Sequence, residues 1–252
     1  MIDALISKFM FPGAGRTPTY SDYDQRYQVV RTGDKNEYLC LKVRCETAEP
    51  RGVFVLFHGN MSDAGRYLGY AYTLAEALKM DVILPELPGY GMAPGRALEA
   101  TAKECAFAMA RYARSMNRPI IVAGNSIGTG SASYMAAELT RMGTPAVLLV
   151  LVAPFESLQK MVDRYSMRIK TNGFPTAENI LTSRCITVCI HGDQDTVVPI
   201  YHSIKIVEKT GALLHTLQNK DHELSLEEDV FPLVLPVIEE RLSHEIVKNY
   251  GM

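Results

Sequence analysis

Short apolar runs alternate with longer amphipathic stretches along most of the chain, and this alternation predicts its architecture. The later runs, such as VFVLF, IIVA and AVLLVLV, are continuously hydrophobic, which indicates strands buried on both faces of a parallel sheet. Strands that alternate with helices form right-handed βαβ units and a doubly wound sheet. We expect strands at Tyr27–Arg31, Tyr38–Arg44, Gly52–Phe57, Asp81–Pro85, Pro119–Ala123, Ala146–Val152, Cys185–Ile190 and Leu213–Leu217. We expect helices at Arg66–Lys79, Leu98–Ser115, Ile127–Arg141, Ile200–Lys209 and Ser225–Glu240.

The connections between these elements indicate how the sheet is built. A short polar turn at residues 32–36 joins the first two strands and suits an antiparallel hairpin. We therefore predict an α/β fold with a mostly parallel eight-stranded sheet, flanked by helices, in one domain over residues 25–252. Residues 154–181 form a longer connection than usual, so we expect a helix and a minimal lid there. Residues 1–24 are expected to pack on or near the core.

The first ten residues admit two interpretations. Their apolar positions, Ile2, Leu5, Ile6, Phe9 and Met10, recur at helical spacing. Such a segment is either a helix docked on the body of the protein or an amphipathic stretch in peripheral contact with a membrane surface. The acidic residue and the lysine within the segment make it a poor signal peptide.

Composition narrows the class of protein. The net charge is −2, and Lys and Arg are scattered rather than gathered in a stripe, which argues against a nucleic-acid partner. The five cysteines are odd in number, which favours reduced thiols in a cytoplasmic protein over a disulfide framework. Cys185 and Cys189 lie four apart, but no further ligands follow at finger-like spacing. We expect neither a metal nor a cofactor.

Ser126 is the strongest candidate for chemistry. It stands in Gly124-Asn125-Ser126-Ile127-Gly128, after an apolar strand and before a helix rich in Ala and Ser. A G-x-S-x-G sequence in this setting is typical of a sharp turn that holds a nucleophilic serine above the sheet, at a helix N-terminus. The two glycines avoid clashes with the neighbouring strand and helix. We therefore predict Ser126 as a nucleophile.

A serine hydroxyl needs a base, and the base needs an orienting acid. The candidate acid is Asp195, in a loop just past a buried strand, where open α/β sheets place their sites. Asp193, which we expect to stabilise the turn, and Glu156 are weaker alternatives. The candidate base is His222, in a polar loop after the last strand.

An oxyanion needs two N–H donors. We expect one from Ile127, directly after the nucleophile, and one from the loop after the third strand. In that loop the donor is Asn60, with Met61 as the weaker alternative. We also expect Met61, Tyr90 and Phe155 to contact substrate.

Five motifs in order, HGNMSD, ELPGYGMAPGRALEA, GNSIGTGSA, HGDQDTVVP and NKDHE, resemble the α/β-hydrolase-domain (ABHD) serine hydrolases, which include protein depalmitoylases. The similarity runs from about Tyr20 to Leu235. It implies the α/β-hydrolase fold, with Ser126 as nucleophile, Asp195 as acid and His222 as base. The chain departs from the depalmitoylases in having no cysteine before Cys40.

We therefore expect a serine hydrolase that cleaves esters or thioesters through an acyl-enzyme, acting on a small-molecule, acyl-protein or lipid substrate. An acyl-protein thioesterase and a lipid esterase rank above a serine peptidase, which in this fold usually carries a large gating domain. The alternative from another class is a non-catalytic binding module that keeps the fold.

Overall fold

The computed structural model describes residues 10–33, 36–163 and 173–250. Its strands are β1 (Gln28–Thr32), β2 (Tyr38–Val43), β3 (Val53–Phe57), β4 (Asp81–Pro85), β5 (Ile120–Asn125), β6 (Leu148–Val152), β7 (Ile186–Gly192) and β8 (Leu213–Leu217). Its helices are α2 (Leu68–Leu78), α3 (Glu99–Ser115), α4 (Gly128–Arg141), α5 (Leu158–Asp163), α6 (Thr176–Ser183), α7 (Tyr201–Thr210) and α8 (Phe231–Tyr250). Each expected strand and helix is present, so the predicted α/β architecture is confirmed.

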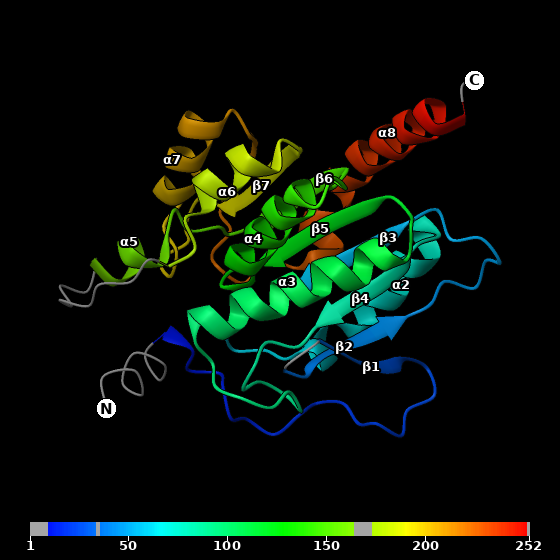
Figure 1. The fold of residues 1–252 in the computed structure, drawn as a ribbon. Helices are drawn as coiled ribbons and strands as arrows, with labels where there is room; N and C mark the ends of the chain where they lie inside the picture. The colour runs from blue at the N-terminus through cyan, green and yellow to red at the C-terminus, as the bar shows by residue number, and fades with distance from the viewer. Residues whose placement is uncertain (1–9, 34–35, 164–172, 251–252) are drawn as a thin grey trace.

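The strands form one eight-stranded sheet in the order β1-β2-β4-β3-β5-β6-β7-β8 (Figure 1). β2 pairs antiparallel with both β1 and β4, and every other pairing is parallel. The antiparallel start and the parallel remainder agree with the sequence prediction. Because the strands from β3 to β8 are parallel, their C-terminal ends meet at one edge of the sheet, where open α/β sheets place their binding sites.

Two hydrophobic cores lie on opposite faces of the sheet, as the continuous apolar runs predict. Along β3, Val55 faces the core that α3 and α4 cover, and Phe54 faces the core that α2 and α8 cover. Both residues are buried, as are all the other residues of the central strands β3, β4 and β6. A strand that is enclosed on both sides needs no polar face, which explains the absence of alternation.

The C-terminal helix differs most from its predicted range. Leu226–Val230 winds as a π-helical turn, and α8 itself begins at Phe231. The helix also continues past the expected end at Glu240, because Leu242 extends the buried stripe of Val234 and Ile238 by one more turn.

The structure describes part of the N-terminal segment, residues 1–24, and part of the expected lid region, residues 154–181. Residues 1–9, which carry most of the amphipathic pattern, lie outside the described residues. Met10 and Phe11 of the N-terminal segment are buried in the core beside α3, whereas Tyr23 further along it is exposed. Within 154–181 the structure describes α5 and most of α6, and residues 164–172 lie outside it. None of the described helices combines the length and the apolarity that crossing a membrane requires.

Candidate active site

Ser126 occupies the sharp turn between β5 and α4. Its backbone adopts a left-handed conformation, with φ of 51°, which is costly for a residue with a side chain. The turn leaves no room at its two glycines: a Cβ on Gly124 would lie 2.5 Å from the carbonyl oxygen of Gly128, and one on Gly128 would lie 2.5 Å from that of Phe57. Tight backbone packing therefore explains the two glycines and holds Ser126 at the end of β5.

A chain of hydrogen bonds links Ser126 through His222 to Asp195. The Oγ of Ser126 lies 3.0 Å from Nε2 of His222. Nδ1 of the same imidazole lies 2.7 Å from Oδ2 of Asp195. The three side chains come from loops after β5, β7 and β8, so the parallel sheet gathers them at one edge. This arrangement lets His222 accept the serine proton through Nε2 while Asp195 orients the ring.

The Asp195 carboxylate is surrounded by N–H donors. Its Oδ1 accepts hydrogen bonds from the backbone N–H groups of Val197 and Val198, at 2.9 and 2.8 Å. Its side chain is fully buried, and burial opposes ionisation. Hydrogen bonds from His191 and His222 outweigh burial and hold the pKa of Asp195 well below its ordinary range. The acid therefore stays ionised at neutral pH, as an orienting carboxylate must.

His191 is a second histidine on the same carboxylate. Its Nε2 lies 3.1 Å from Oδ2 of Asp195 and 2.7 Å from the carbonyl oxygen of Val198. Both neighbours are acceptors, so we assign the ring proton to Nε2. Nδ1 then accepts a hydrogen bond from the hydroxyl of Ser203, at 2.7 Å. His191 and His222 therefore both hydrogen-bond to Oδ2, and His191 helps to fix the position of the carboxylate.

Two backbone N–H groups are available beside the serine. Ile127 follows Ser126 at the N-terminus of α4, and Asn60 lies in the loop after β3. Within the described part of the chain, neither N–H donates a backbone hydrogen bond. The Asn60 side chain is fixed, because its Nδ2 donates to the carbonyl of Met10 at 2.8 Å and its Oδ1 accepts from Tyr90 at 2.5 Å. The two amides are therefore suited to receive an oxyanion.

A buried ion pair supports the Asn60 amide from behind. His58 Nδ1 lies 2.8 Å from the carbonyl oxygen of Gly59, which belongs to the same peptide group as the Asn60 N–H. On its other side, Nε2 lies 2.8 Å from Oε1 of Glu86. Burial disfavours the charged ring, but the nearby Glu86 carboxylate prevails and raises the pKa of His58. By holding the carbonyl, His58 sets the direction of the N–H at the other end of the peptide plane.

Ser126, His222, Asn60 and Ile127 line a cleft of about 600 Å³ with a largely apolar wall. The wall includes Met61 and Phe155, the two residues expected to contact substrate, together with Leu158 and Met161 of α5. Tyr90 does not line the cleft, and our prediction for it is wrong. Its ring is 1% exposed and its hydroxyl bonds to Asn60, because the loop after β4 turns the side chain inward.

The weaker candidates lie apart from this chain of hydrogen bonds. Neither Asp193 nor Glu156 makes a hydrogen bond or ion pair with His222 among the described residues. One carboxylate oxygen of Asp193 is buried without a partner in that part of the structure, so the expected bracing of the turn is not seen. The described residues also contain no group of three or more His, Cys, Asp or Glu side chains that could hold a metal ion.

Known proteins with similar sequences identify the family of the chain. Residues 54–185 match the alpha/beta hydrolase family. The chain is 27% identical over 197 residues to the alpha/beta hydrolase domain-containing protein aho-3 of Caenorhabditis elegans, covering 72% of this chain and 54% of that protein. It is 24% identical over 177 residues to lysophosphatidylserine lipase ABHD12 of Danio rerio, covering 62% and 46%. The chain thus spans about half the length of the curated relatives it matches.

Solved structures extend the likeness to the fold. The crystal structure of the Paleococcus ferrophilus monoacylglycerol lipase superposes with a TM-score of 0.61 at 17% identity, covering 82% of this chain and 99% of that one. At this level of identity the likeness concerns the fold alone.

Proposed function

The chain belongs to the alpha/beta hydrolase family, and on that premise we propose that it is a serine hydrolase that cleaves carboxylic esters or thioesters with a hydrophobic acyl chain. The observation that carries the proposal is the hydrogen-bonded series Ser126, His222 and Asp195 beside two unused N–H donors. Serine, imidazole and carboxylate in this order form a nucleophile, a base and an orienting acid.

The reaction proceeds in two halves. His222 Nε2 takes the proton of Ser126 as Oγ attacks the carbonyl carbon, and the oxyanion accepts hydrogen bonds from the Asn60 and Ile127 N–H groups. The imidazolium then gives its proton to the leaving alcohol or thiol, and an acyl-enzyme remains. In the second half His222 takes a proton from water, the resulting hydroxide attacks the acyl group, and the carboxylic acid leaves as Ser126 regains its proton.

The cleft wall favours an acyl chain over a polar substrate. Met61 is 51% exposed, although a large apolar side chain is costly to expose, and it borders the cleft with Phe155, Leu158 and Met161. Covering these side chains with a hydrocarbon chain would stabilise binding by about 25 cal/mol for each Å² removed from water. A lipid ester or an acylated protein thioester would supply such a chain, and one relative is named for lipase activity on a lysophospholipid.

Hydrolysis of graded substrates tests this function. p-Nitrophenyl esters with acyl chains from two to sixteen carbons, and a palmitoyl-cysteine peptide, would be compared on the purified protein. We expect kcat/KM to rise with chain length and Ser126→Ala to abolish turnover. Ser62→Ala removes another hydroxyl from the same cleft, outside the Ser126–His222–Asp195 series, and should retain activity. Absence of turnover on every ester and thioester would overturn the proposal in favour of a binding module.

A further inference from the structure

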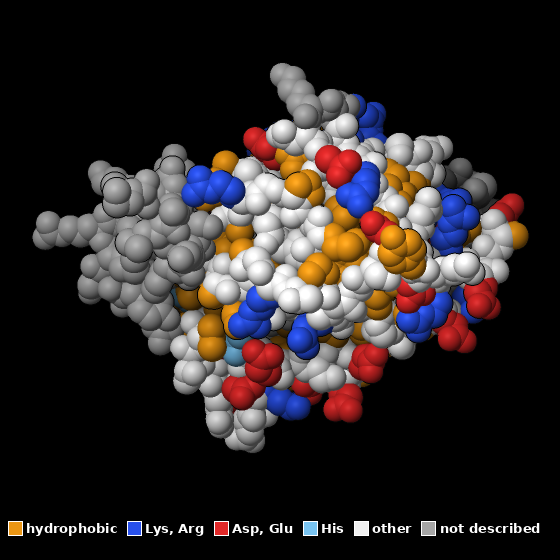
Figure 2. Space-filling view, turned by 90° about the horizontal axis from the view of Figure 1, so that it is seen from below, with side chains coloured by type: hydrophobic (Ala, Val, Ile, Leu, Met, Phe, Trp, Pro, Cys, Tyr) orange, Lys and Arg blue, Asp and Glu red, His pale blue; other side chains and the backbone are white. Residues whose placement is uncertain are grey.

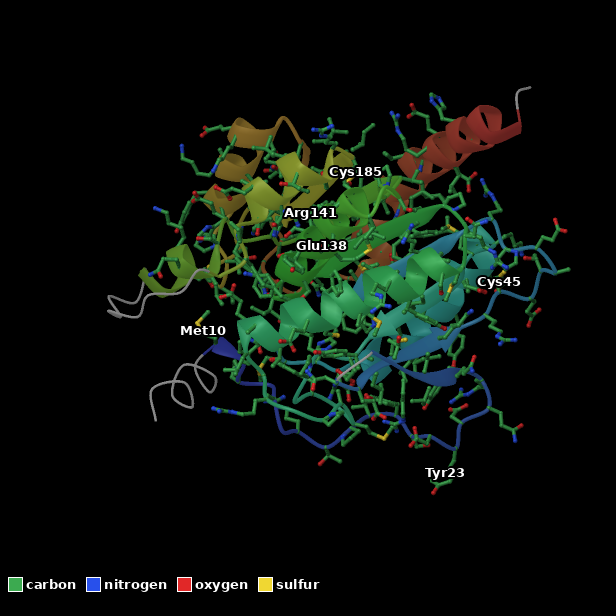
Figure 3. The ribbon with its side chains drawn as sticks, in the orientation of Figure 1. Met10, Tyr23, Cys45, Glu138, Arg141 and Cys185 are labelled. Atoms are coloured by element: carbon green, nitrogen blue, oxygen red, sulfur yellow. The ribbon has the colours of Figure 1, made fainter. Side chains whose placement is uncertain are left out.

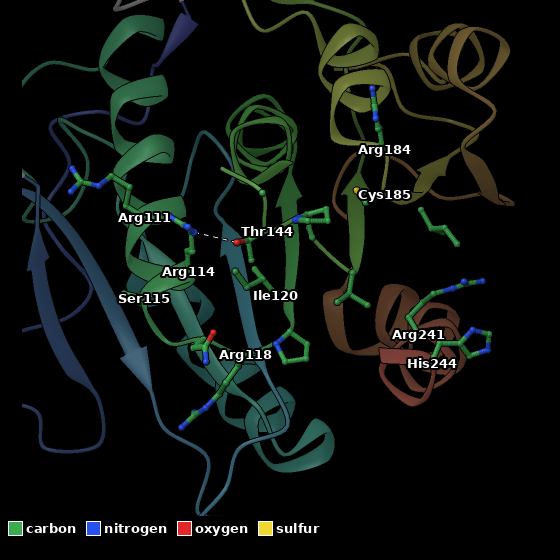
Figure 4. A pocket seen from close by; sticks show the side chains of 17 residues that line it. Arg111, Arg114, Ser115, Arg118, Ile120, Thr144, Arg184, Cys185, Arg241 and His244 are labelled. Atoms are coloured by element: carbon green, nitrogen blue, oxygen red, sulfur yellow. Dashed lines mark hydrogen bonds between the residues drawn. The ribbon is translucent and has the colours of Figure 1, made fainter. Parts of the chain in front are cut away.

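A second large cavity opens at the opposite edge of the sheet. It has a volume of about 1070 Å³ and is lined by Ile120 at the start of β5 and Ile186 at the start of β7 (Figure 4). The candidate active site lies where those strands end. In Figure 3, Met10 marks the active-site edge and Cys185 the edge with the second cavity. A ligand in this cavity would therefore not share the cleft of Ser126.

Positively charged side chains are concentrated around the cavity. Five arginines and one histidine line it: Arg111, Arg114, Arg118, Arg184, Arg241 and His244. Its described lining contains no Asp or Glu. The chain as a whole carries a net charge of −2, and on the face seen in Figure 2 cationic and anionic side chains are interspersed. The cavity is thus a positive region on a slightly negative protein.

Nearby carboxylates neutralise only part of this charge. Asp81 lies 3.4 Å from Arg118, but the same carboxylate also pairs with Lys42 at 3.1 Å. Arg114 donates to the hydroxyl of Thr144 at 3.1 Å, which brings no negative charge (Figure 4). Among the described residues Arg184 forms no ion pair with a carboxylate.

One donor in the cavity has no partner at all in the described structure. Arg241 pairs through Nη2 with Glu240 at 3.0 Å, yet its Nε is buried and makes no hydrogen bond. A buried N–H of a charged group is costly to leave unpaired. The Glu240 carboxylate therefore leaves one donor of this guanidinium without a partner among the described residues.

Helix ends explain some of the arginines but not all. The C-termini of α3 and α6 carry partial negative charge of about half an electron each, which Arg114 and Arg184 can offset. Arg184, however, holds a left-handed backbone with φ of 54°, where glycine is the favoured residue at a helix end. Arg118 follows α3 in a loop and Arg241 lies within α8, so neither serves a helix C-terminus.

We propose that this cavity binds a multiply phosphorylated anion, either a soluble molecule or a lipid headgroup. Guanidinium groups match phosphate oxygens in pairs, which makes arginine the preferred residue for such ligands. Several arginines around one large cavity suit two or more phosphates rather than a single small anion. The cavity volume of about 1070 Å³ is large enough for a molecule that carries several phosphates.

Binding measurements with three probes test the proposal and separate the two sources. The probes are ATP, inositol hexakisphosphate, and vesicles that contain phosphatidylinositol 4,5-bisphosphate. We expect saturable binding of at least one probe, weakening as salt rises because screening reduces charge interactions. The Ser126→Ala variant should bind equally well, since the cavity is remote from the cleft. Binding of vesicles without either soluble probe would assign a headgroup, and binding of a soluble probe would assign a free ligand.

A matched pair of variants shows whether the cavity is the site. Arg114→Gln with Arg184→Gln removes two exposed arginines from the lining, and we expect affinity to fall by about tenfold or more. Arg26→Gln with Arg31→Gln removes the same charge beside β1 and should leave affinity within about twofold. No saturable binding of any probe, or an equal loss in both double variants, would overturn the proposal.

Discussion

The Asp195→Asn substitution should reverse the direction of the hydrogen bond between residue 195 and His222. In the structure, two backbone N–H groups, of Val197 and Val198, converge on Oδ1, and the ring of His222 faces Oδ2. Asparagine offers only one oxygen. The backbone donors cannot change direction, so the oxygen must face them and the new amino group must face His222. The ring then accepts at Nδ1 and carries its proton on Nε2, which points at Ser126 and cannot take the serine proton.

The expected loss follows from that tautomer. The corresponding change in serine proteases with the same three groups lowers kcat by about 10⁴-fold. Here the two backbone donors at Oδ1 favour the same orientation, while the Nε2–H of His191 keeps the carbonyl oxygen of Val198 as its acceptor. We therefore expect a fall in kcat of about 10⁴, equal to about 5.5 kcal/mol of transition-state stabilisation. KM should change little, because the side chain of Asp195 is buried behind the ring and does not reach the cleft.

Steady-state hydrolysis of a short p-nitrophenyl ester measures this effect, with circular dichroism to check that the variant is folded. Asp193→Asn is the matched control, since it removes a carboxylate from the same loop without a bond to His222. We expect the control to stay within about tenfold of the wild type. A folded Asp195→Asn variant with kcat within tenfold of the wild type, or a larger loss at Asp193, would refute the assignment of the acid.

Two further substitutions test residues that hold the candidate active site in position. Glu86→Gln removes the partner of His58, so kcat should fall by about tenfold to a hundredfold at similar KM, as expected when one oxyanion donor is misaligned. The ion pair with Glu86 raises the pKa of His58, so the pair stabilises the fold fully below about pH 6.5 and loses this effect as pH rises through the raised pKa. The difference in melting temperature between the wild type and Glu86→Gln should therefore narrow as pH rises. Gly128→Ala places a Cβ 2.5 Å from a backbone carbonyl oxygen and should lower the unfolding free energy in urea by about 1–3 kcal/mol. Gly69→Ala, at an exposed position of α2, meets no atom within 4 Å and should raise the unfolding free energy by about 0.5–1 kcal/mol. Equal destabilisation by both substitutions would contradict the packing explanation.

Local pattern predicted the elements because burial on both faces leaves a clear signature. The run at Val53–Phe57 is apolar throughout, and every residue of it is buried. The same pattern could not reveal that β2 lies between β1 and β4, since strand order depends on contacts between distant segments. Ser126 and Asp195 were predictable in the same way, because each follows a recognisable buried strand. His222 follows β8, whose residues are exposed or half-buried, and it was predicted from its polar loop after the last strand.

The hydrophobic pattern could not predict the direction of side chains or the pairing of residues that are far apart in the sequence. Tyr90 lies in the expected loop, but the backbone of that loop turns its ring inward onto Asn60. The pairing of His58 with Glu86 joins the loops after β3 and β4, which a local sequence pattern does not reveal. The arginine cavity likewise joins α3, the loop after it, the end of α6, and α8, which are far apart in sequence.

Ser126 is the nucleophile in the proposed reaction, and covalent labelling is a direct test of this role. Purified protein would be treated with a fluorophosphonate probe, digested, and analysed by mass spectrometry. We expect one adduct on the Ser126 peptide, lost in Ser126→Ala and retained in Ser62→Ala. Absence of labelling on folded wild-type protein, or an adduct on another serine that persists in Ser126→Ala, would contradict it.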